Sequence, residues 1–263
     1  MTALHYYLID PTKNITALAD TPISPESRPA LAARIMNEEP SCEQVGFVDF
    51  SGKTPRLDMA GGEFCGNAAM SAAALYCANC GIPAGGTRRV TLDVSGADKP
   101  VEVAVAEQNG AFACTVAMPA PERISKETLF LGNRQLSLPV VYCPGIAHIM
   151  VTEDELTTAE AESALKGWCA ALATQALGVM FLDRDALTLR PLVYVPAADT
   201  LCWESSCASG TCAAGAYLAD RAERDVALTL SEPGGTLRVQ TGPQSESLLS
   251  GRVAILKERT VNY

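Results

Sequence analysis

The chain has 263 residues, of which 48% are hydrophobic and 19% are charged, and this composition excludes a disordered or fibrous protein. Its formal net charge is -10 without a dense run of lysine or arginine, so we expect no binding of nucleic acid or of an anionic membrane. The N-terminus lacks the basic and apolar regions of a secretion signal, and no stretch approaches the roughly 18 to 20 apolar residues of a membrane span. We therefore expect a cytoplasmic protein with a small-molecule or protein partner.

Short β-rich segments with period-two or continuous apolar patterns dominate the chain. In chain order, the predicted strands are 5–9, 44–50, 89–94, 101–106, 112–117, 136–142, 147–151, 179–182, 187–195, 201–204, 226–230, 236–240 and 248–256. The predicted helices are fewer and lie at 27–37, 67–80, 158–177 and 209–224. The pattern indicates an α+β protein in which strands prevail.

Two of these helices differ from ordinary surface helices, because the runs 68–76 and 210–218 are small or apolar on every face. Such helices belong inside a protein. We therefore predict two α+β halves, each a curved, mainly antiparallel sheet wrapped around a central helix. The predicted domains are 1–120 and 121–254, and the last strand, near 255–263, is expected to pack on the first half.

An internal repeat supports this division into two pseudo-symmetric halves. Aligning Cys65-Gly66-Asn67-Ala68-Ala69 with Cys207-Ala208-Ser209-Gly210-Thr211 also superposes Ala72 on Ala214. Both copies begin with a cysteine at the same point before the helix. The pattern indicates two copies of one structural unit.

The sequence holds ten cysteines and only two histidines. A chain of this length buries an ample core without disulfides, and the cytosol keeps thiols reduced. We expect eight of the cysteines to be small packing side chains. These are Cys42, Cys77, Cys80, Cys114, Cys143, Cys169, Cys202 and Cys212.

Cys65 and Cys207 are each predicted to stand at the N-terminus of a buried helix. The unpaired N–H groups and the helix dipole there stabilise an anion, either a thiolate or a substrate carboxylate. With the two halves face to face, one thiolate could remove an α-proton while the opposite thiol protonates the other face, which inverts the stereocentre. No dinucleotide or phosphate-binding fingerprint is present, so we expect no cofactor.

The segments Gly62-Glu63-Phe64-Cys65-Gly66-Asn67-Ala68 and Cys207-Ala208-Ser209-Gly210-Thr211 resemble the two signature motifs of the diaminopimelate epimerase superfamily of cofactor-independent amino-acid racemases. The order of other residues agrees along nearly the whole chain: Asn14, Gln44, His148 and Pro233-Gly234-Gly235. Within the superfamily, segments such as 42–47, 191–196 and 203–207 are similar to the histidine racemases of staphylopine-type opine metallophore biosynthesis. The resemblance implies a diaminopimelate epimerase-like fold and a homodimer.

The resemblance also assigns roles to individual residues. It implies that Cys65 and Cys207 form the base and acid pair, and that His148 and Glu204 support the cysteines or orient the substrate amine. The remaining residues that it places around the substrate are Asn14, Gln44, Phe47, Gly66, Asn67, Ala208, Ser209 and Gly210. It implies no metal ligand.

Ser205 stands where diaminopimelate epimerases carry an arginine before the second cysteine. Because arginine is the side chain suited to a distal carboxylate, its absence disfavours diaminopimelate. A histidine side chain fits an apolar or aromatic pocket that contains hydrogen-bond partners. Phe47, Trp203, Gln44 and Glu204 could supply such a pocket. We therefore expect racemisation of histidine for metallophore synthesis.

Three alternatives remain open at this point. The enzyme could epimerise diaminopimelate or another amino acid. It could instead be a cysteine-rich metal-binding module, for which Cys77 and Cys80 have ligand spacing, although no second close pair follows. A non-catalytic amino-acid binder is the third, but a pure binder needs neither Cys65 nor Cys207.

Overall fold

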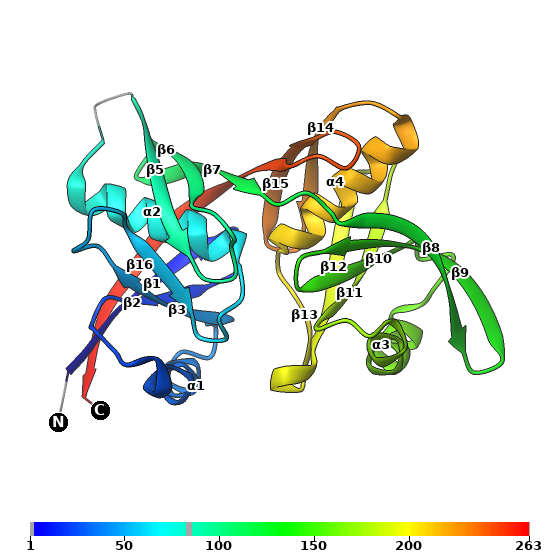
Figure 1. Cartoon of the computed structure of the whole chain (residues 1–263), viewed down its shortest axis with the longest axis horizontal. Coiled ribbons are helices and arrows are strands. Elements are labelled where there is room, and N and C mark those ends of the chain that lie inside the picture. The colour runs from blue at the N-terminus through cyan, green and yellow to red at the C-terminus, as the bar shows by residue number, and fades with distance from the viewer. Residues whose placement is uncertain (1–2, 83–85, 263) are drawn as a thin grey trace. The chain divides into compact units, whose positions relative to one another are not determined.

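The structure is a computed structural model that describes residues 3–82 and 86–262. Its helices are α1 (Arg28–Glu38), α2 (Gly66–Cys80), α3 (Thr158–Leu172) and α4 (Ala208–Ala222). The strands of the first part are β1 (Ala3–Pro11), β2 (Thr16–Ala19), β3 (Gln44–Asp49), β4 (Arg56–Met59), β5 (Thr87–Val94), β6 (Val101–Gln108) and β7 (Ala111–Met118). The remaining strands are β8 (Arg123–Leu131), β9 (Arg134–Cys143), β10 (Ile146–Val151), β11 (Leu177–Asp183), β12 (Thr188–Val195), β13 (Thr200–Trp203), β14 (Val226–Glu232), β15 (Gly235–Thr241) and β16 (Ser247–Asn262) (Figure 1).

The chain forms two compact units. Unit 1 holds the described residues up to Ala117 together with those from Ser250 onward, and unit 2 is Met118–Leu249. Strand β16 begins in unit 2 and ends in unit 1, so unit 1 contains both termini of the described chain.

In unit 1, the sheet closes around helix α2. The strand order is β1-β2-β3-β4-β5-β6-β7-β16, and β16 returns to pair antiparallel with β1. Helix α2 contacts β1, β2, β5 and β6, while α1 lies against β3 (Figure 1). Leu31 and Ile35 of α1 pack in a buried cluster with Tyr6, Leu8 and Phe47 of the strands.

In unit 2, the strand order is β15-β14-β12-β11-β10-β9-β8, and β13 pairs with β12. Helix α4 contacts β9, β10, β14 and β15, and α3 packs against β8, β11 and β12. Helix α3 starts with a capping box, in which Thr157 and Glu160 satisfy each other's backbone N–H groups. Its Trp168 lies in a buried cluster with Leu165 and Phe181.

The two units repeat one topology. Apart from β7, β8, β13 and β16, each runs strand, strand, helix, strand, strand, helix, strand, strand, and corresponding pairs have the same sense. For example, β2–β3 and β10–β11 are parallel, while β3–β4 and β11–β12 are antiparallel. The predicted α+β fold with two pseudo-symmetric halves, each a curved sheet around a central helix, is confirmed.

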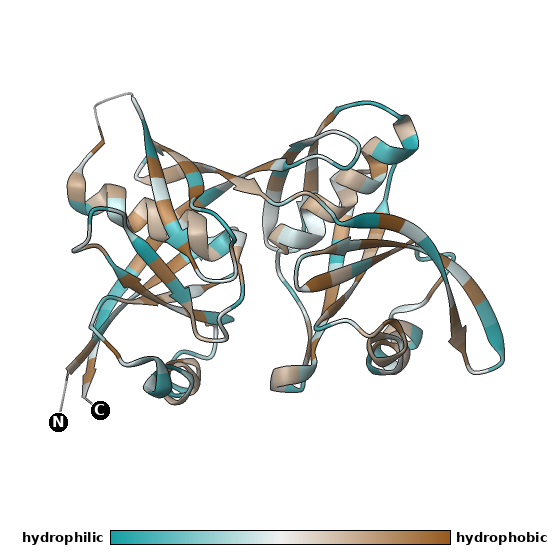
Figure 2. Cartoon of the chain, in the orientation of Figure 1, coloured by the Kyte–Doolittle hydropathy of each residue, from teal (hydrophilic) through white to brown (hydrophobic). Residues whose placement is uncertain are grey.

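The central helices are buried because of their small side chains. Most of α2 is buried from Gly66 to Cys77, and α4 is buried over most of Ala208–Ala219. Figure 2 shows both helices largely in tan and pale colours, which mark hydrophobic and weakly polar residues. A helix with this surface lets strands approach it on several sides.

One predicted helix was too long. The pattern predicted helix over 158–177, but α3 ends at Leu172 because Ala173 adopts the left-handed conformation, with φ of 52°. Leu177 already belongs to β11. Strands β2, β4 and β8 were not predicted.

The ten cysteines are free thiols. In the ranges 3–82 and 86–262, the structure brings together no group of three or more His, Cys, Asp or Glu residues that could hold a metal ion. The same part of the chain contains no helix of the length and apolar character that crossing a membrane requires.

Candidate active site

Cys65 is the N-cap residue of α2. Its backbone is extended, with φ of -135° and ψ of 115°, and its Sγ accepts the N–H of Ala68 at 3.4 Å. Burial raises the pKa of this thiol to about 11. The buried Gly66 and Asn67 follow it in the first turn of the helix.

A chain of polar side chains reaches Cys65 from β3 and from the segment before β2. Glu43 accepts the Asn14 amide N–H at 2.6 Å, and Asn14 Oδ1 accepts an N–H of Gln44 at 2.6 Å. The second N–H of Gln44 is donated to Thr16 Oγ1 at 2.8 Å. Gln44 Oε1 therefore faces Cys65 and accepts its S–H at 3.1 Å.

These contacts fix the orientation of both amides. The Glu43 carboxylate accepts hydrogen bonds and donates none, so the nitrogen of Asn14 must face it. Asn14 Oδ1 in turn selects the nitrogen of Gln44, which leaves the Gln44 oxygen for the thiol. The network therefore favours the protonated form of the Cys65 thiol, which is the form that a general acid needs.

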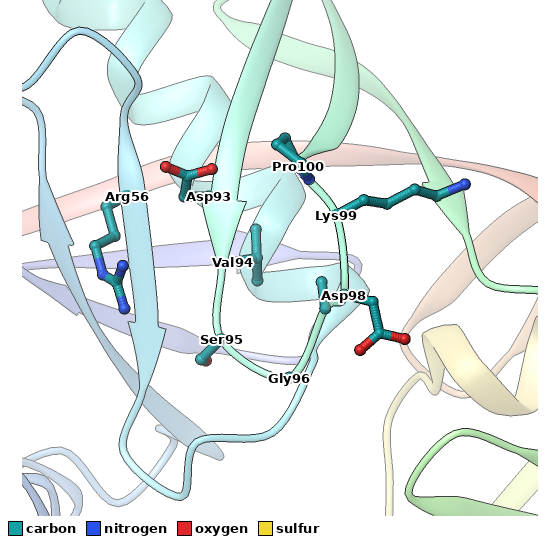
Figure 3. Close-up of a pocket in the computed structure, with 9 residues that line it drawn as sticks. Arg56, Asp93, Val94, Ser95, Gly96, Asp98, Lys99 and Pro100 are labelled. Carbon is teal, nitrogen blue, oxygen red and sulfur yellow. The ribbon is translucent and has the colours of Figure 1, made fainter.

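The loop after β5 supports the segment that leads to Cys65. Ser95 Oγ accepts the N–H of Met59 at 2.8 Å and donates to the Glu63 carbonyl at 3.0 Å. Gly96 has φ of 71°, and a Cβ placed there would lie 2.3 Å from the nitrogen of Phe64. The loop also lines a pocket of about 340 Å³, which is formed by residues 93–100 together with Arg56 (Figure 3).

Phe47 and Asn67 occupy different surroundings. Phe47 is 5% exposed and belongs to the core cluster beneath α1, and the Arg28 guanidinium lies 5.4 Å from the centre of its ring. Asn67 is 3% exposed, and its Oδ1 has no hydrogen-bond partner among the described residues. Asn67 thus carries an unused acceptor beside Cys65, whereas Phe47 packs in the core.

Cys207 is the N-cap residue of α4 and matches Cys65 in its backbone, with φ of -128° and ψ of 107°. Its Sγ accepts the N–H of Gly210 at 3.4 Å and lies 3.5 Å from Ser209 Oγ. A Cβ at position 210 would lie 3.2 Å from this sulfur and 2.5 Å from Met180 Sδ, so glycine gives the thiol its space. Ala208, 5% exposed, lies between the cysteine and Ser209.

His148 reaches Cys207 through Ser209. Its Nε2 lies 3.1 Å from Ser209 Oγ, and its Nδ1 has no partner among the described residues. Burial lowers the pKa of His148 to about 3, so the ring is neutral. A buried N–H without a partner is costlier than an unused lone pair, so we assign the proton to Nε2, which donates to Ser209. The Ser209 hydroxyl is then available to donate to the sulfur.

Glu204 follows β13 and lies beside Cys207. Burial raises the pKa of its carboxyl to about 7, against a hydrogen bond with Cys207 that lowers it. Burial, followed by the charge of Glu204, raises the pKa of the Cys207 thiol well above its ordinary value. The Glu204 carboxyl has the lower pKa of the two and accepts the S–H of Cys207, a position from which it can act as the base for this thiol.

One further residue at this cysteine, Glu232, is not predicted from the sequence. Glu232 Oε2 accepts the backbone N–H of Cys207 at 2.7 Å, and Glu232 Oε1 is hydrogen-bonded to Thr211 Oγ1. Glu232 is 8% exposed. The available signal is the alternation of β14, which places this glutamate on the same buried side as Leu230.

Each unit therefore assembles its own set of predicted residues. Unit 1 brings Asn14 and Gln44 to Cys65, with Gly66 and Asn67 behind it. Unit 2 brings His148, Ser209 and Glu204 to Cys207. In chemical terms, unit 1 presents a thiol that is hydrogen-bonded to the amide oxygen of Gln44. Unit 2 presents a thiol beside the carboxyl of Glu204 and the hydroxyl of Ser209.

Comparison with known proteins places the chain in a family. A family model described as the histidine racemase CntK N-terminal domain matches residues 3–259. A histidine racemase from Fusobacterium nucleatum is 32% identical over 98% of this chain and 97% of its own length. A histidine racemase from Staphylococcus aureus is 28% identical over 88% of this chain and 85% of its own length.

The fold is shared with more distant proteins. A hydroxyproline epimerase from Agrobacterium vitis, solved with bound trans-4-hydroxy-L-proline, has a TM-score of 0.73 at 11% identity, covering 98% of this chain and 92% of its own. A phenazine biosynthesis protein of the PhzF family from Bacillus anthracis has a TM-score of 0.74 at 13% identity over the full length of both chains. The chain belongs to the histidine racemase family and is an isomerase of the amino-acid racemase class.

Proposed function

We propose that this protein racemises histidine without a cofactor, with Cys65 and Cys207 as the two proton-transfer groups. The main support for this proposal is that the two cysteines occupy equivalent N-cap positions on the two equivalent buried helices. Their partners differ in a complementary way. The Cys65 thiol donates a hydrogen bond to an amide oxygen, while Cys207 has beside it a carboxyl that can take its proton. One end is thus suited to deliver a proton and the other to receive one.

In the direction that starts at Cys207, Glu204 takes the thiol proton. The hydroxyl of Ser209 and the N–H of Gly210 stabilise the resulting thiolate, since both lie within 3.5 Å of the sulfur. The thiolate then removes the α-proton of the substrate. His148 holds the Ser209 hydroxyl in place and stays neutral throughout.

Cys65 completes the reaction on the opposite face of the α-carbon. Its S–H bond breaks as the proton passes to the carbanion, and the electron pair of the bond remains on sulfur. Cys207 is left as a thiol, Glu204 as a neutral acid and Cys65 as a thiolate, which is the starting state for the reverse direction. Exchange of these protons with solvent returns the enzyme to its first state.

The substrate α-carboxylate is proposed to bind at the N-termini of the central helices, around Gly66 and Asn67 and around Ala208, Ser209 and Gly210. The N–H groups of a first helical turn have no partner within the helix. They favour a carboxylate in the ground state and the negative charge that spreads into it when the α-proton leaves. The unused Asn67 Oδ1 is an acceptor for the substrate ammonium group.

Histidine is the proposed substrate on two grounds. The relatives that match nearly the whole chain are histidine racemases. Ser205 also stands in place of an arginine that would bind a distal carboxylate, and this favours a substrate without one. The proposed role is to supply D-histidine in the cytoplasm for synthesis of an opine metallophore, with the enzyme acting as a homodimer.

The test is incubation with L-histidine in deuterated water without added cofactor. We expect deuterium at the α-carbon together with loss of optical activity, and we expect no racemisation from Cys65→Ser or Cys207→Ser. Full racemisation by either variant would rule out the two-thiol mechanism. A parallel panel of amino acids, diaminopimelate included, tests the substrate, and faster turnover of another amino acid would replace histidine.

A further inference from the structure

The strand that follows each central helix supports the segment before the corresponding cysteine. In unit 1, Ser95 at the end of β5 donates to the carbonyl of Glu63 at 3.0 Å. In unit 2, Gly234, in the turn between β14 and β15, donates its N–H to the carbonyl of Ser205 at 2.7 Å. Glu63 and Ser205 each lie two residues before their cysteine. The repeat thus extends to the support of the two thiols.

The hydrogen bonds that support the two cysteine segments differ by one carboxyl group. Unit 2 adds the carboxyl of Glu232, which binds the Cys207 N–H at 2.7 Å and also contacts the Thr211 hydroxyl. Unit 1 uses the neutral Ser95 at its support. Glu232 therefore distinguishes the surroundings of Cys207 from those of Cys65.

The two contacts of the Thr211 hydroxyl favour an extra proton on Glu232. Thr211 Oγ1 lies 2.8 Å from the Cys207 carbonyl, to which it donates, and it also contacts Glu232 Oε1. A hydroxyl has a single proton and cannot donate to both oxygens. Both contacts are hydrogen bonds when Glu232 carries a proton and donates it to Thr211. In that state Glu232 Oε2 still accepts the N–H of Cys207.

We propose that Glu232 is a positioning residue that acts as a neutral carboxylic acid, holding Cys207 and the first turn of α4, and that its ionisation opposes formation of the Cys207 thiolate. The role in racemisation rests on the proposed function, whereas the protonation of Glu232 stands apart from it. Burial raises the pKa of Glu232 to about 8, in agreement with the proton count. An ionised Glu232 adds a negative charge near the sulfur and opposes formation of the thiolate.

The other ionisable groups near Glu232 lie on the segments that surround it. Glu204 precedes α4, and its charge acts on both Glu232 and Cys207. Cys212 lies within α4, and burial raises the pKa of its thiol so that it stays neutral. A comparison that changes only Glu232 leaves these groups in place.

The central variant is Glu232→Gln, whose amide reproduces the protonated acid: its oxygen accepts the Cys207 N–H and its nitrogen donates to Thr211. In infrared spectra at neutral pH, we expect the wild type to show a protonated-carboxyl band that this variant lacks and that disappears near pH 8. Glu204 is present in both proteins and cancels in the difference. An absent band difference would overturn the proposal.

Thiolate absorbance measures the effect on Cys207. The signal of each protein minus that of its Cys207→Ser counterpart isolates this thiol. We expect an apparent pKa about one unit lower in Glu232→Gln, which is a tenfold change in the ionisation equilibrium. Equal pKa values in both backgrounds would show that Glu232 does not control the thiol.

Racemisation tests the positioning role. We expect Glu232→Gln to retain kcat within about threefold near neutral pH and to lose less activity than the wild type above pH 8, and Glu232→Leu to lose about tenfold at every pH. Full activity of a folded Glu232→Leu protein would overturn this role. Failure of the proposed function itself would appear as no racemisation by the wild type, and the infrared and absorbance results would still decide the state of Glu232.

Discussion

Gln44 and His148 lie on equivalent parallel strand pairs of the two units, each on a different member of its pair. Gln44 lies on β3 opposite Thr16 of β2, and His148 lies on β10 opposite Gly178 of β11, so both belong to the corresponding parallel strand pair. Gln44 contacts Cys65 directly, and His148 acts through Ser209. Both side chains are uncharged, which leaves the charge changes of the reaction to the thiols and Glu204.

Replacing Gln44 by methionine removes the acceptor for the Cys65 proton and keeps the volume of the side chain. We expect kcat for racemisation to fall at least about tenfold, because the thiol loses the group that orients it. Thr16→Val is the matched control, since Gln44 keeps its bond to Asn14 and the effect should be smaller. Equal losses in the two variants would contradict the proposed role of Gln44.

Gly96→Ala should disturb the segment before Cys65. The added Cβ would lie 2.3 Å from the Phe64 nitrogen, so the loop must move. Gly110→Ala is the control: its φ of 74° is close to the 71° of Gly96, and nothing lies within 4 Å of its added Cβ. Both variants bear the strain of a left-handed alanine, but we expect a fall in kcat from Gly96→Ala alone. Similar activity in both would show that the loop does not position Cys65.

Gly210→Ala tests the space around Cys207. The new methyl group would lie 2.5 Å from Met180 Sδ and 3.2 Å from Cys207 Sγ, and we expect lower kcat and lower stability. Gly167→Ala lies inside α3 with no atom within 4 Å, and it should instead stabilise the protein by about 0.5 to 1 kcal/mol. Denaturant unfolding and racemisation rates measure both effects. Undiminished turnover by Gly210→Ala would contradict the close packing at this thiol.

His148 should make the protein less stable in acid. Its pKa is about 3 in the folded state against an ordinary 6.5, so the unfolded chain binds a proton that the folded chain excludes. The corresponding stability is fully present above pH 6.5 and is lost as the pH falls from 6.5 towards 3. We expect the free energy of unfolding of His148→Gln to fall less steeply over this range.

His5 gives the opposite sign and serves as the control. Burial opposes its protonation, but its contacts with Asp20 and Glu258 raise its pKa above 6.5. Its stabilisation is present below pH 6.5 and is lost as the pH rises through the folded pKa. His5→Gln should therefore steepen the loss of stability on acidification. If the free energy of unfolding falls equally steeply with pH in the wild type and both variants, neither histidine governs the loss of stability in acid.

The parts of the fold that could be predicted are those with a strong local pattern. The small residues of α2 and α4 indicate burial by themselves, and their cysteines mark both helix starts. Strand β2 has four wholly buried residues and shows no alternation. Strand β4 is equally short and carries Arg56 and Asp58, while β8 buries only Leu129 and mixes polar with apolar residues. These strands form because neighbouring strands supply hydrogen bonds, and a local pattern does not contain that information.

The same distinction holds at the site. The positions of Gln44, His148 and Glu204 could be inferred from a resemblance, but the link from His148 through Ser209 depends on tertiary packing. Glu232 was missed because a glutamate at the end of a strand is ordinarily exposed, and only the fold places it against the start of α4.

The return of β16 to unit 1 affects the order in which the protein folds during synthesis. Unit 1 pairs β1 with residues from Val253 to Asn262, so its sheet cannot close until the last part of the chain has left the ribosome. Unit 2 is complete at Leu249, so its sheet does not need the part of β16 that pairs with β1. The half whose strands are made first is therefore closed last, by a strand more than 240 positions further along the chain than its partner β1.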